Sequence, residues 1–294
     1  MNYVIENDLI RVTVSDTGAE IVSVYGKTTR FEYLWQGNPE FWQGRAPLLF
    51  PICGRLTDGK YVYNGKEYSM IIHGFARKKT FALAEKSGDK AVFVLESDEE
   101  TLAQYPFPFR LTVTYILNGS TVRTAMKVEN TGKSDLRFSL GGHPGFNLPL
   151  KEGAAFDEHY LEFSKAKECE KLVMSDTCFY TGKTQPFPLE NGKILRLSHS
   201  LFDNDAIFLS GMDDTVTLKC EKGGRSVTVR FNDMTHLGFW HKPRSEAPYV
   251  CIEPWHGVPS FDKKIDDFNS KAELISLAPD RTYETFFDIT VSER

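Results

Sequence analysis

The chain has 294 residues, of which 41% are hydrophobic, and its formal net charge is −5. A chain of this size can bury a large core in one all-β domain or in two ordinary domains. Acidic and basic residues are mixed along the whole length, and the absence of a basic stripe or arm excludes a typical nucleic-acid-binding protein.

The N-terminus and the cysteines point to the cytoplasm. Residues 1–8 lack the basic region and apolar run of a secretory signal, and no segment approaches the ~18 apolar residues of a membrane span. The cysteines are scattered without a C-x-x-C pair, at Cys53, Cys169, Cys178, Cys220 and Cys251. We therefore expect free thiols in a reducing compartment, no metal centre and no membrane partner.

Hydrophobic residues recur at every second position in several segments, beginning with Ile10, Val12 and Val14. This period of two is typical of half-buried strands. The same alternation continues through Leu111, Val113 and Tyr115, Met126 and Val128, and Val227 and Val229.

Turn signals separate these strands. The dipeptides Asn64-Gly65, Asn118-Gly119 and Gly223-Gly224 supply the positive φ angles that tight hairpins require. Helical signal is thin: one or two turns are expected over Asp98–Tyr105, ended by Pro106, and another short piece over Asn38–Trp42. The sequence predicts one all-β domain over residues 1–294, a large antiparallel sandwich or barrel with few short helices.

Four segments break the alternation, and such places in β proteins tend to be functional or strained. In the first, two prolines precede Arg55, whose fixed fork of donors either grips hydroxyl groups in a cleft or pairs with a surface carboxylate. In the second, His73 lies among apolar residues before Gly74, as a core histidine or as a site residue at a strand end.

The third segment surrounds His143 with three glycines and two prolines, and Pro144 pushes this histidine towards an extended conformation. A histidine presented in this way suits general acid or base work, because its ordinary pKa of about 6.5 lies near neutrality. In the fourth, an apolar run leads into Glu253, which Pro254 keeps extended at the end of a strand. Glu253 is either a general base or one partner of a buried salt bridge.

Taken in order, five segments resemble the aldose 1-epimerase (galactose mutarotase) family over nearly the whole chain. Each motif is weak alone, and the order makes the set specific. Within the family, the length and the wording of residues 45–55 look closest to the LacX-like subgroup, which is found with lactose-utilisation proteins. The matching segments are Leu49–Arg55, His73–Arg77, Gly142–Phe146, Glu253–Trp255 and Leu277–Glu284.

The resemblance implies a large antiparallel β-supersandwich and a mutarotase that interconverts the anomers of an aldose without a cofactor or metal. It implies His143 as the general acid and Glu253 as the general base. It also implies Arg55 and His73 as groups that hold the ring oxygen and nearby hydroxyls. An aspartate that binds sugar hydroxyls is best matched by Asp205, with Asp203 as the alternative.

Two positions depart from the family pattern. Asp280 replaces the glycine of the closing motif, where a turn tolerates either residue. Gly145 replaces the tyrosine of the histidine motif. The loss of a bulky side chain beside the acid predicts extra room there, which leaves space for a different sugar and leaves the substrate specificity open.

Two other functions fit part of these residues. A glycoside hydrolase or lyase would bring two carboxylates to the scissile bond, and a non-catalytic carbohydrate-binding protein would need no matched acid and base. The sugar itself stays open between a free hexose and a hexose phosphate. A phosphate would call for extra cations, for which Arg45, Arg77 and Lys242 are the candidates. The sequence is compatible with a monomer or a homodimer.

Overall fold

The computed structural model describes the backbone of residues 1–293 and the side chains of residues 1–292. Its largest sheet has nine antiparallel strands. In spatial order these are β18 (Ile194–Arg196), β15 (His159–Phe163), β20 (Thr215–Cys220), β21 (Arg225–Asn232), β26 (Thr282–Glu293), β11 (Thr121–Asn130), β10 (Phe109–Asn118), β9 (Lys90–Glu96) and β8 (Ala82–Lys86).

A second sheet has eight strands, seven of them in one path and the eighth, β14 (Gly145–Asn147), paired with β23. The path runs through β17 (Tyr180–Phe187), β16 (Cys169–Met174), β19 (Ile207–Ser210), β22 (His236–Trp240), β23 (Tyr249–His256), β13 (Leu140–Gly142) and β5 (Leu48–Leu49).

Three small sheets complete the described strands. They comprise β1 (Asn2–Glu6), β2 (Ile10–Ser15), β3 (Ile21–Gly26) and β4 (Phe31–Glu32); β24 (Asp266–Asp267), β6 (Lys60–Tyr63) and β7 (Lys66–Ser69); and β12 (Leu136–Phe138) with β25 (Ile275–Leu277). The predicted hairpins are confirmed, because β6 pairs with β7, β10 with β11 and β20 with β21.

Helices are few and short, as predicted. The α-helix α1 (Glu99–Gln104) is capped at its N-terminus by Asp98, whose side chain accepts a hydrogen bond from the Thr101 N–H. The 3₁₀ segments are η1 (Thr57–Gly59), η2 (Ala76–Lys78), η3 (Phe156–Glu158) and η4 (His199–Phe202). The helical piece expected over Asn38–Trp42 is wrong, since these residues form turns within a loop. No helix in the described part of the chain is long and apolar enough to cross a membrane.

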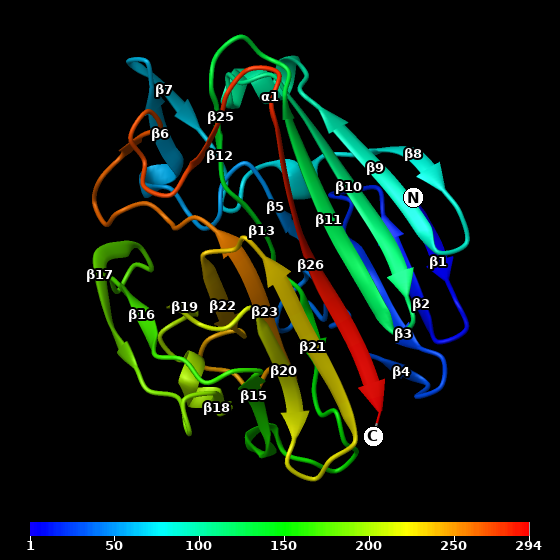
Figure 1. Ribbon diagram of the computed structural model, residues 1–294. Coiled ribbons are helices and arrows are strands. Elements are labelled where there is room, and N and C mark those ends of the chain that lie inside the picture. The colour runs from blue at the N-terminus through cyan, green and yellow to red at the C-terminus, as the bar shows by residue number, and fades with distance from the viewer. Residues whose placement is uncertain (294) are drawn as a thin grey trace.

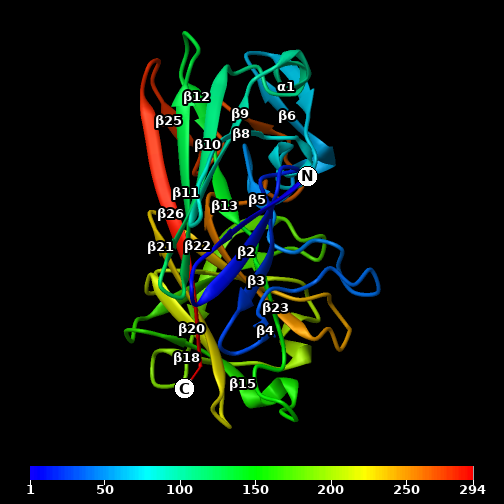
Figure 2. The ribbon, with the colours of Figure 1, turned by 90° about the vertical axis from the view of Figure 1, so that its right-hand side faces the viewer.

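The two large sheets form packed layers around the largest hydrophobic cluster of the described residues (Figures 1 and 2). Figure 2 shows β26, β11 and β10 in one layer, with β13, β22 and β23 beside them in the other. The core includes the alternating residues that the sequence predicted, such as Val12, Val113 and Val229, each with no exposed surface. Apolar side chains on one face of each sheet therefore hold the layers together.

The central strand β23 is buried along both of its faces. Val250 and Ile252 point into the core between the sheets. The alternate residues Cys251, Glu253 and Trp255 lie on the opposite face, away from that core. Glu253 therefore lies inside β23 rather than at a strand end as predicted, and it faces outward from the sandwich.

Candidate functional site

A cavity of about 700 Å³ opens on the outer face of the eight-stranded sheet. All five residues that the sequence singled out line it: Arg55, His73, His143, Asp205 and Glu253. Asp203 does not line the cavity; it follows η4 at the C-terminal cap position. The structure thus brings together residues from across the chain, and it places Asp205 but not Asp203 at the cavity.

Strand register places His143 across from Glu253. On either side of this position Gly141 pairs with Trp255 and Gly145 with Cys251. The Nε2 atom of His143 lies 3.3 Å from Oε2 of Glu253. Both residues are buried, with 8% and 1% of their surface exposed.

Burial favours the neutral form of both groups. It lowers the pKa of His143 to about 4. It also raises the pKa of Glu253 well above its ordinary value, and the negative charge of nearby Asp205 adds to this rise. Burial therefore favours a neutral His143 beside a Glu253 that keeps its proton. Moving that proton to His143 creates a carboxylate beside an imidazolium.

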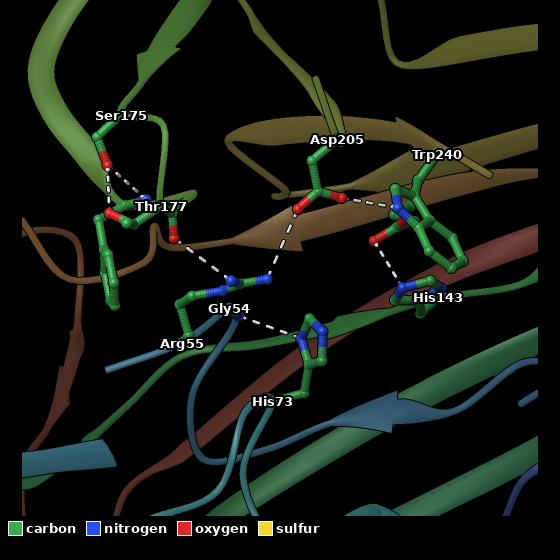
Figure 3. A network of polar contacts seen from close by, with 10 residues as sticks. Gly54, Arg55, His73, His143, Ser175, Thr177, Asp205 and Trp240 are labelled. Carbon is green, nitrogen blue, oxygen red and sulfur yellow. Dashed lines mark hydrogen bonds and ion pairs between the residues drawn. The ribbon is translucent and has the colours of Figure 1, made fainter. Parts of the chain in front are cut away.

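His73 reaches the cavity from a turn in which its own φ is 65°. The N–H of Gly54 donates a 3.1 Å hydrogen bond to its Nδ1 (Figure 3). Burial lowers the pKa of His73 well below its ordinary value, and the charges of His143, Arg77 and Arg55 contribute. Because Nδ1 accepts a hydrogen bond, the neutral ring carries its proton on Nε2. His73 is thus a hydrogen-bond donor at this atom.

Asp205 is held at the cavity by two neighbours (Figure 3). The indole N–H of Trp240 donates a 2.8 Å hydrogen bond to Oδ1, and Arg55 lies 3.6 Å from Oδ2. Arg55 also donates to the carbonyl of Thr177 at 3.4 Å. These contacts fix a carboxylate beside a guanidinium, a combination that accepts and donates hydrogen bonds to neighbouring hydroxyl groups.

Two tryptophans of the cavity were not singled out from the sequence. Trp42 lies 4.9 Å from the His143 ring between centroids, and Trp240 lies 5.7 Å from it. Both line the cavity. The chain is 13% aromatic, a composition that favours such walls, but the position of each ring depends on a loop or a neighbouring strand.

The extra room expected at Gly145 is not there. A Cβ atom on this residue would lie 3.1 Å from the Trp42 ring, 3.3 Å from Sγ of Cys251 and 3.3 Å from Cβ of Trp35. The Trp42 indole therefore fills the space that the missing tyrosine side chain suggested was free. The prediction of a roomier site is wrong because a loop distant in sequence covers this position.

The three candidate cations for a phosphate group lie in different places. Arg45 donates to the Val22 carbonyl and Lys242 to the Glu40 carbonyl, and neither residue lines the cavity. Arg77 does line it, and its buried Nε has no hydrogen-bond partner within the described residues. Of the three, only Arg77 is placed to meet a ligand.

One cluster has the donor types of a metal site. The ligating atoms of His143, Cys251 and Glu253 lie within 4.8 Å of one another, and all three residues are buried. Cys251, however, does not line the cavity, and burial raises the pKa of its thiol well above the ordinary value. The groups that face the cavity are better suited to hydrogen bonding with a polar organic ligand.

Comparison with known proteins gives a consistent result. The sequence profile of the family described as aldose 1-epimerase matches residues 1–289. Two Lactococcus lactis proteins named LacX, one plasmid-encoded and one chromosomal, are 34% and 33% identical to the chain. In each case the match covers 99% of both sequences.

Solved structures share the fold. A galactose mutarotase-related enzyme from Lactobacillus acidophilus is 34% identical, with a TM-score of 0.94 over 99% of this chain and 97% of that one. A galactose mutarotase-like protein from Lactobacillus casei is 28% identical, with a TM-score of 0.93 over 99% and 100% of the two chains. The two-layered architecture is therefore the galactose mutarotase-like fold.

Proposed function

Since the chain belongs to the aldose 1-epimerase family, we propose that it is a mutarotase that interconverts the α and β anomers of an aldose without a metal or organic cofactor. The observation that carries this proposal is the buried pair of His143 and Glu253, which face each other across strand register at a cavity of hydroxyl-binding groups.

Ring opening transfers two protons. Glu253, as carboxylate, takes the proton of the C1 hydroxyl, and the O–H electron pair forms the C1 carbonyl. The C1–O5 bond breaks, and the ring oxygen takes the proton of His143. The aldehyde then turns about the C1–C2 bond, and the reverse transfers close the ring on the other face. Acid–base catalysis of this kind contributes roughly 10²–10⁴-fold.

The electrostatics of the pair support these steps. The buried Oε1 of Glu253 has no hydrogen-bond partner within residues 1–292, so a sugar hydroxyl that donates to it stabilises the carboxylate. The shared proton then moves to His143, which gives the reactive ion pair. Ring opening returns both groups to the neutral forms that burial favours. Burial therefore favours ring opening, because the two proton transfers remove the charges of the buried pair.

Three further groups position the sugar in this proposal. The Nε2–H of His73 and the guanidinium of Arg55 donate to the ring oxygen or adjacent hydroxyls. The carboxylate of Asp205 accepts from hydroxyls on the same side of the cavity. Hydrogen bonds of this type fix the sugar ring relative to the acid and the base. Holding reacting groups in the correct geometry in this way contributes to the rate of an enzyme.

The direct test follows anomer exchange by polarimetry in wild-type protein and in the Glu253→Gln and His143→Asn variants. We expect both variants to lose most of the acceleration over buffer. Near-wild-type rates in either would refute its role. Saturable sugar binding without acceleration by the wild type would identify a carbohydrate-binding protein, and release of reducing sugar from a glycoside would identify a hydrolase.

The sugar is identified by a panel of free aldoses and hexose 6-phosphates, each assayed for anomer exchange by NMR. Because the LacX-like subgroup is found with lactose-utilisation proteins, galactose is the first aldose to test, and we propose the cytoplasm as the compartment. The Arg77→Gln variant discriminates between the two classes. If Arg77 binds the phosphate of a phosphorylated sugar, this variant should have a higher KM for that sugar. If the substrate is a free hexose, its KM should be the same in the variant and in the wild type.

A further inference from the structure

The imidazole of His143 lacks the hydrogen bond that usually orients a reactive histidine. In many sites of this kind, the second ring nitrogen is bonded to a carboxylate or carbonyl that fixes ring orientation. Here Nδ1 is buried and has no hydrogen bond to any other described residue, and the only backbone group that acts on the ring in this way is that of His143 itself. The other nitrogen, Nε2, lies 3.3 Å from Oε2 of Glu253, the group with which it has to exchange a proton. Ring packing must therefore supply the orientation.

Three rings surround the imidazole, and they contact it differently. The indole of Trp42 lies 4.9 Å away at an interplanar angle of 31°, so it covers a face of the imidazole. Trp240 and His73 approach nearly perpendicular to it, at 77° and 89°. A ring over the face opposes tilting of the imidazole, whereas the edge contacts leave Nε2 beside Glu253.

Trp42 is itself held in place at several points. Its carbonyl accepts a 2.7 Å hydrogen bond from the indole N–H of Trp35, and its N–H donates to the Asn38 carbonyl at 3.0 Å. Its ring also stacks on Tyr249, with centroids 5.8 Å apart and planes at 27°. The loop over residues 36–47 thus presents this indole in one orientation.

Two glycines leave the space for the indole. A Cβ atom on Gly44 would lie 2.5 Å from Cζ2 of Trp42, and one on Gly145 would lie 3.1 Å from Cζ3. Neither glycine has a positive φ, so backbone conformation does not require glycine at either position. Gly145, the departure from the family motif, is therefore explained by the indole that packs against it.

We propose that Trp42 is a positioning residue that holds the His143 imidazole in its reactive orientation by packing against one of its faces, in place of a hydrogen bond between Nδ1 and another residue. The proposal rests on the proposed role of His143 as the acid. In this proposal, Gly44 and Gly145 are glycines because a side chain at either position would crowd the indole. It makes the histidine loop and the loop over residues 36–47 one unit, in which a change on one side requires a change on the other.

The first experiment compares Trp42→Ala, Trp42→Phe and the control Glu40→Ala in anomer exchange followed by NMR. Glu40 is exposed and lies on the same loop. We expect kcat to fall about 10-fold or more in Trp42→Ala, since misplaced reacting groups have effects of this size. KM should change less than kcat, Trp42→Phe should lose less, and Glu40→Ala should match the wild type.

The pH profile gives a second readout. Removal of the indole admits water to the imidazole, which relieves the burial that lowers the pKa of His143. The limb of the rate profile that belongs to His143 should therefore move to higher pH in Trp42→Ala. Imidazole ¹⁵N spectra of the sugar-free protein report the same change and the gain in ring mobility without any need for catalysis.

The third experiment uses compensation between the two loops. Gly145→Ala should lower kcat because its methyl group crowds the indole, and adding Trp42→Phe should restore part of the loss because the smaller ring leaves room. Wild-type kcat and unchanged His143 spectra in Trp42→Ala would overturn the proposal, and so would simple additivity of Gly145→Ala and Trp42→Phe. If wild-type protein shows no anomer exchange but the His143 spectra still respond to Trp42→Ala, the proposed function fails while the positioning role stands.

Discussion

The side chains on the two faces of β23 are equally well buried, but their burial has opposite effects on the stability of the fold. On the inner face Val250 and Ile252 have no exposed surface and pack into the core between the sheets. On the outer face Glu253 is 1% exposed, yet one of its oxygens has no hydrogen-bond partner within the described residues. The first arrangement stabilises the fold, and the second destabilises it.

This difference shows how a rigid strand makes a reactive site possible. Alternation along β23 fixes the direction of every side chain once the inner face is packed. The packing of the inner face therefore holds an acidic group on the outer face in buried surroundings, although its burial costs free energy. Substitutions on the two faces should separate stability from activity.

The largest effect is expected for Glu253→Gln. The amide keeps the shape of the side chain but cannot take the C1 proton, so the rate of anomer exchange should fall roughly 10²–10⁴-fold. The thermal midpoint should stay the same or rise, because a buried ionisable group is removed. Polarimetry and thermal unfolding on the same sample measure both. A large loss of stability at unchanged rate would reverse the assignment of the faces.

The inner face should show the opposite result. Ile252→Ala removes a fully buried side chain from the core, and the free energy of unfolding should fall by about 2–5 kcal/mol. The anomer-exchange rate per folded molecule should remain close to that of the wild type. Urea unfolding gives the first quantity, and assays at a temperature where the variant is folded give the second. A selective loss of activity would show that the faces are coupled.

A smaller effect separates two neighbouring aspartates. Asp205→Asn weakens the acceptor in the cavity, and KM for the sugar should rise about 10-fold, the size expected for a charged hydrogen bond. Asp203→Asn, outside the cavity lining, is the matched control and should leave KM unchanged. Initial rates across a range of sugar concentrations make the comparison. Equal effects of the two changes would remove Asp205 from the binding groups.

The pH dependence of stability should show opposite contributions from the pair. Between about pH 4 and 6.5 the unfolded chain binds a proton at His143 that the folded chain does not, so this group lowers stability as pH falls. Glu253, with its raised pKa, keeps a proton above pH 4.5 that the unfolded chain loses, so it lowers stability as pH rises.

Relative to the wild type, unfolding free energies measured across this range should rise more steeply with pH in Glu253→Gln. They should rise less steeply, or fall, in His143→Asn. Parallel curves for the three proteins would mean that neither residue has a shifted pKa in the fold.

The smallest effect is expected from metal removal. The proposed acid–base steps use only side chains of this protein, so dialysis against EDTA should leave the anomer-exchange rate unchanged. A loss of activity that zinc restores would instead assign the cluster of His143, Cys251 and Glu253 to a metal.

Local sequence patterns predicted much of the fold. The period of two located the strands, and the Asn-Gly and Gly-Gly turns located the hairpins, because both signals depend on near neighbours in the chain. The helical piece expected over Asn38–Trp42 failed for the complementary reason. The conformation of that loop depends on contacts with Trp35 and Tyr249 as well as on its own hydrogen bonds to Asn38.

The site was predicted as a set of residues but not as a geometry. Ordered motifs indicated His143 and Glu253, yet their separation of 3.3 Å depends on the pairing of β13 and β14 with β23. The sequence left Asp203 and Asp205 as alternatives, and only the turn before β19 distinguishes which one lines the cavity. Gly145 was interpreted as empty space because the residue that fills it is distant in the chain.

The sequence by itself therefore determined the membership of the family, the all-β class and the chemical types of the groups at the site. These depend on residue identity, order and local periodicity. The tertiary structure decided which groups meet, how deeply they are buried and which protonation form burial favours in each. Burial and register arise from strands and loops brought together over long stretches of chain, and it is this enclosure that shifts the pKa of His143 downward and that of Glu253 upward.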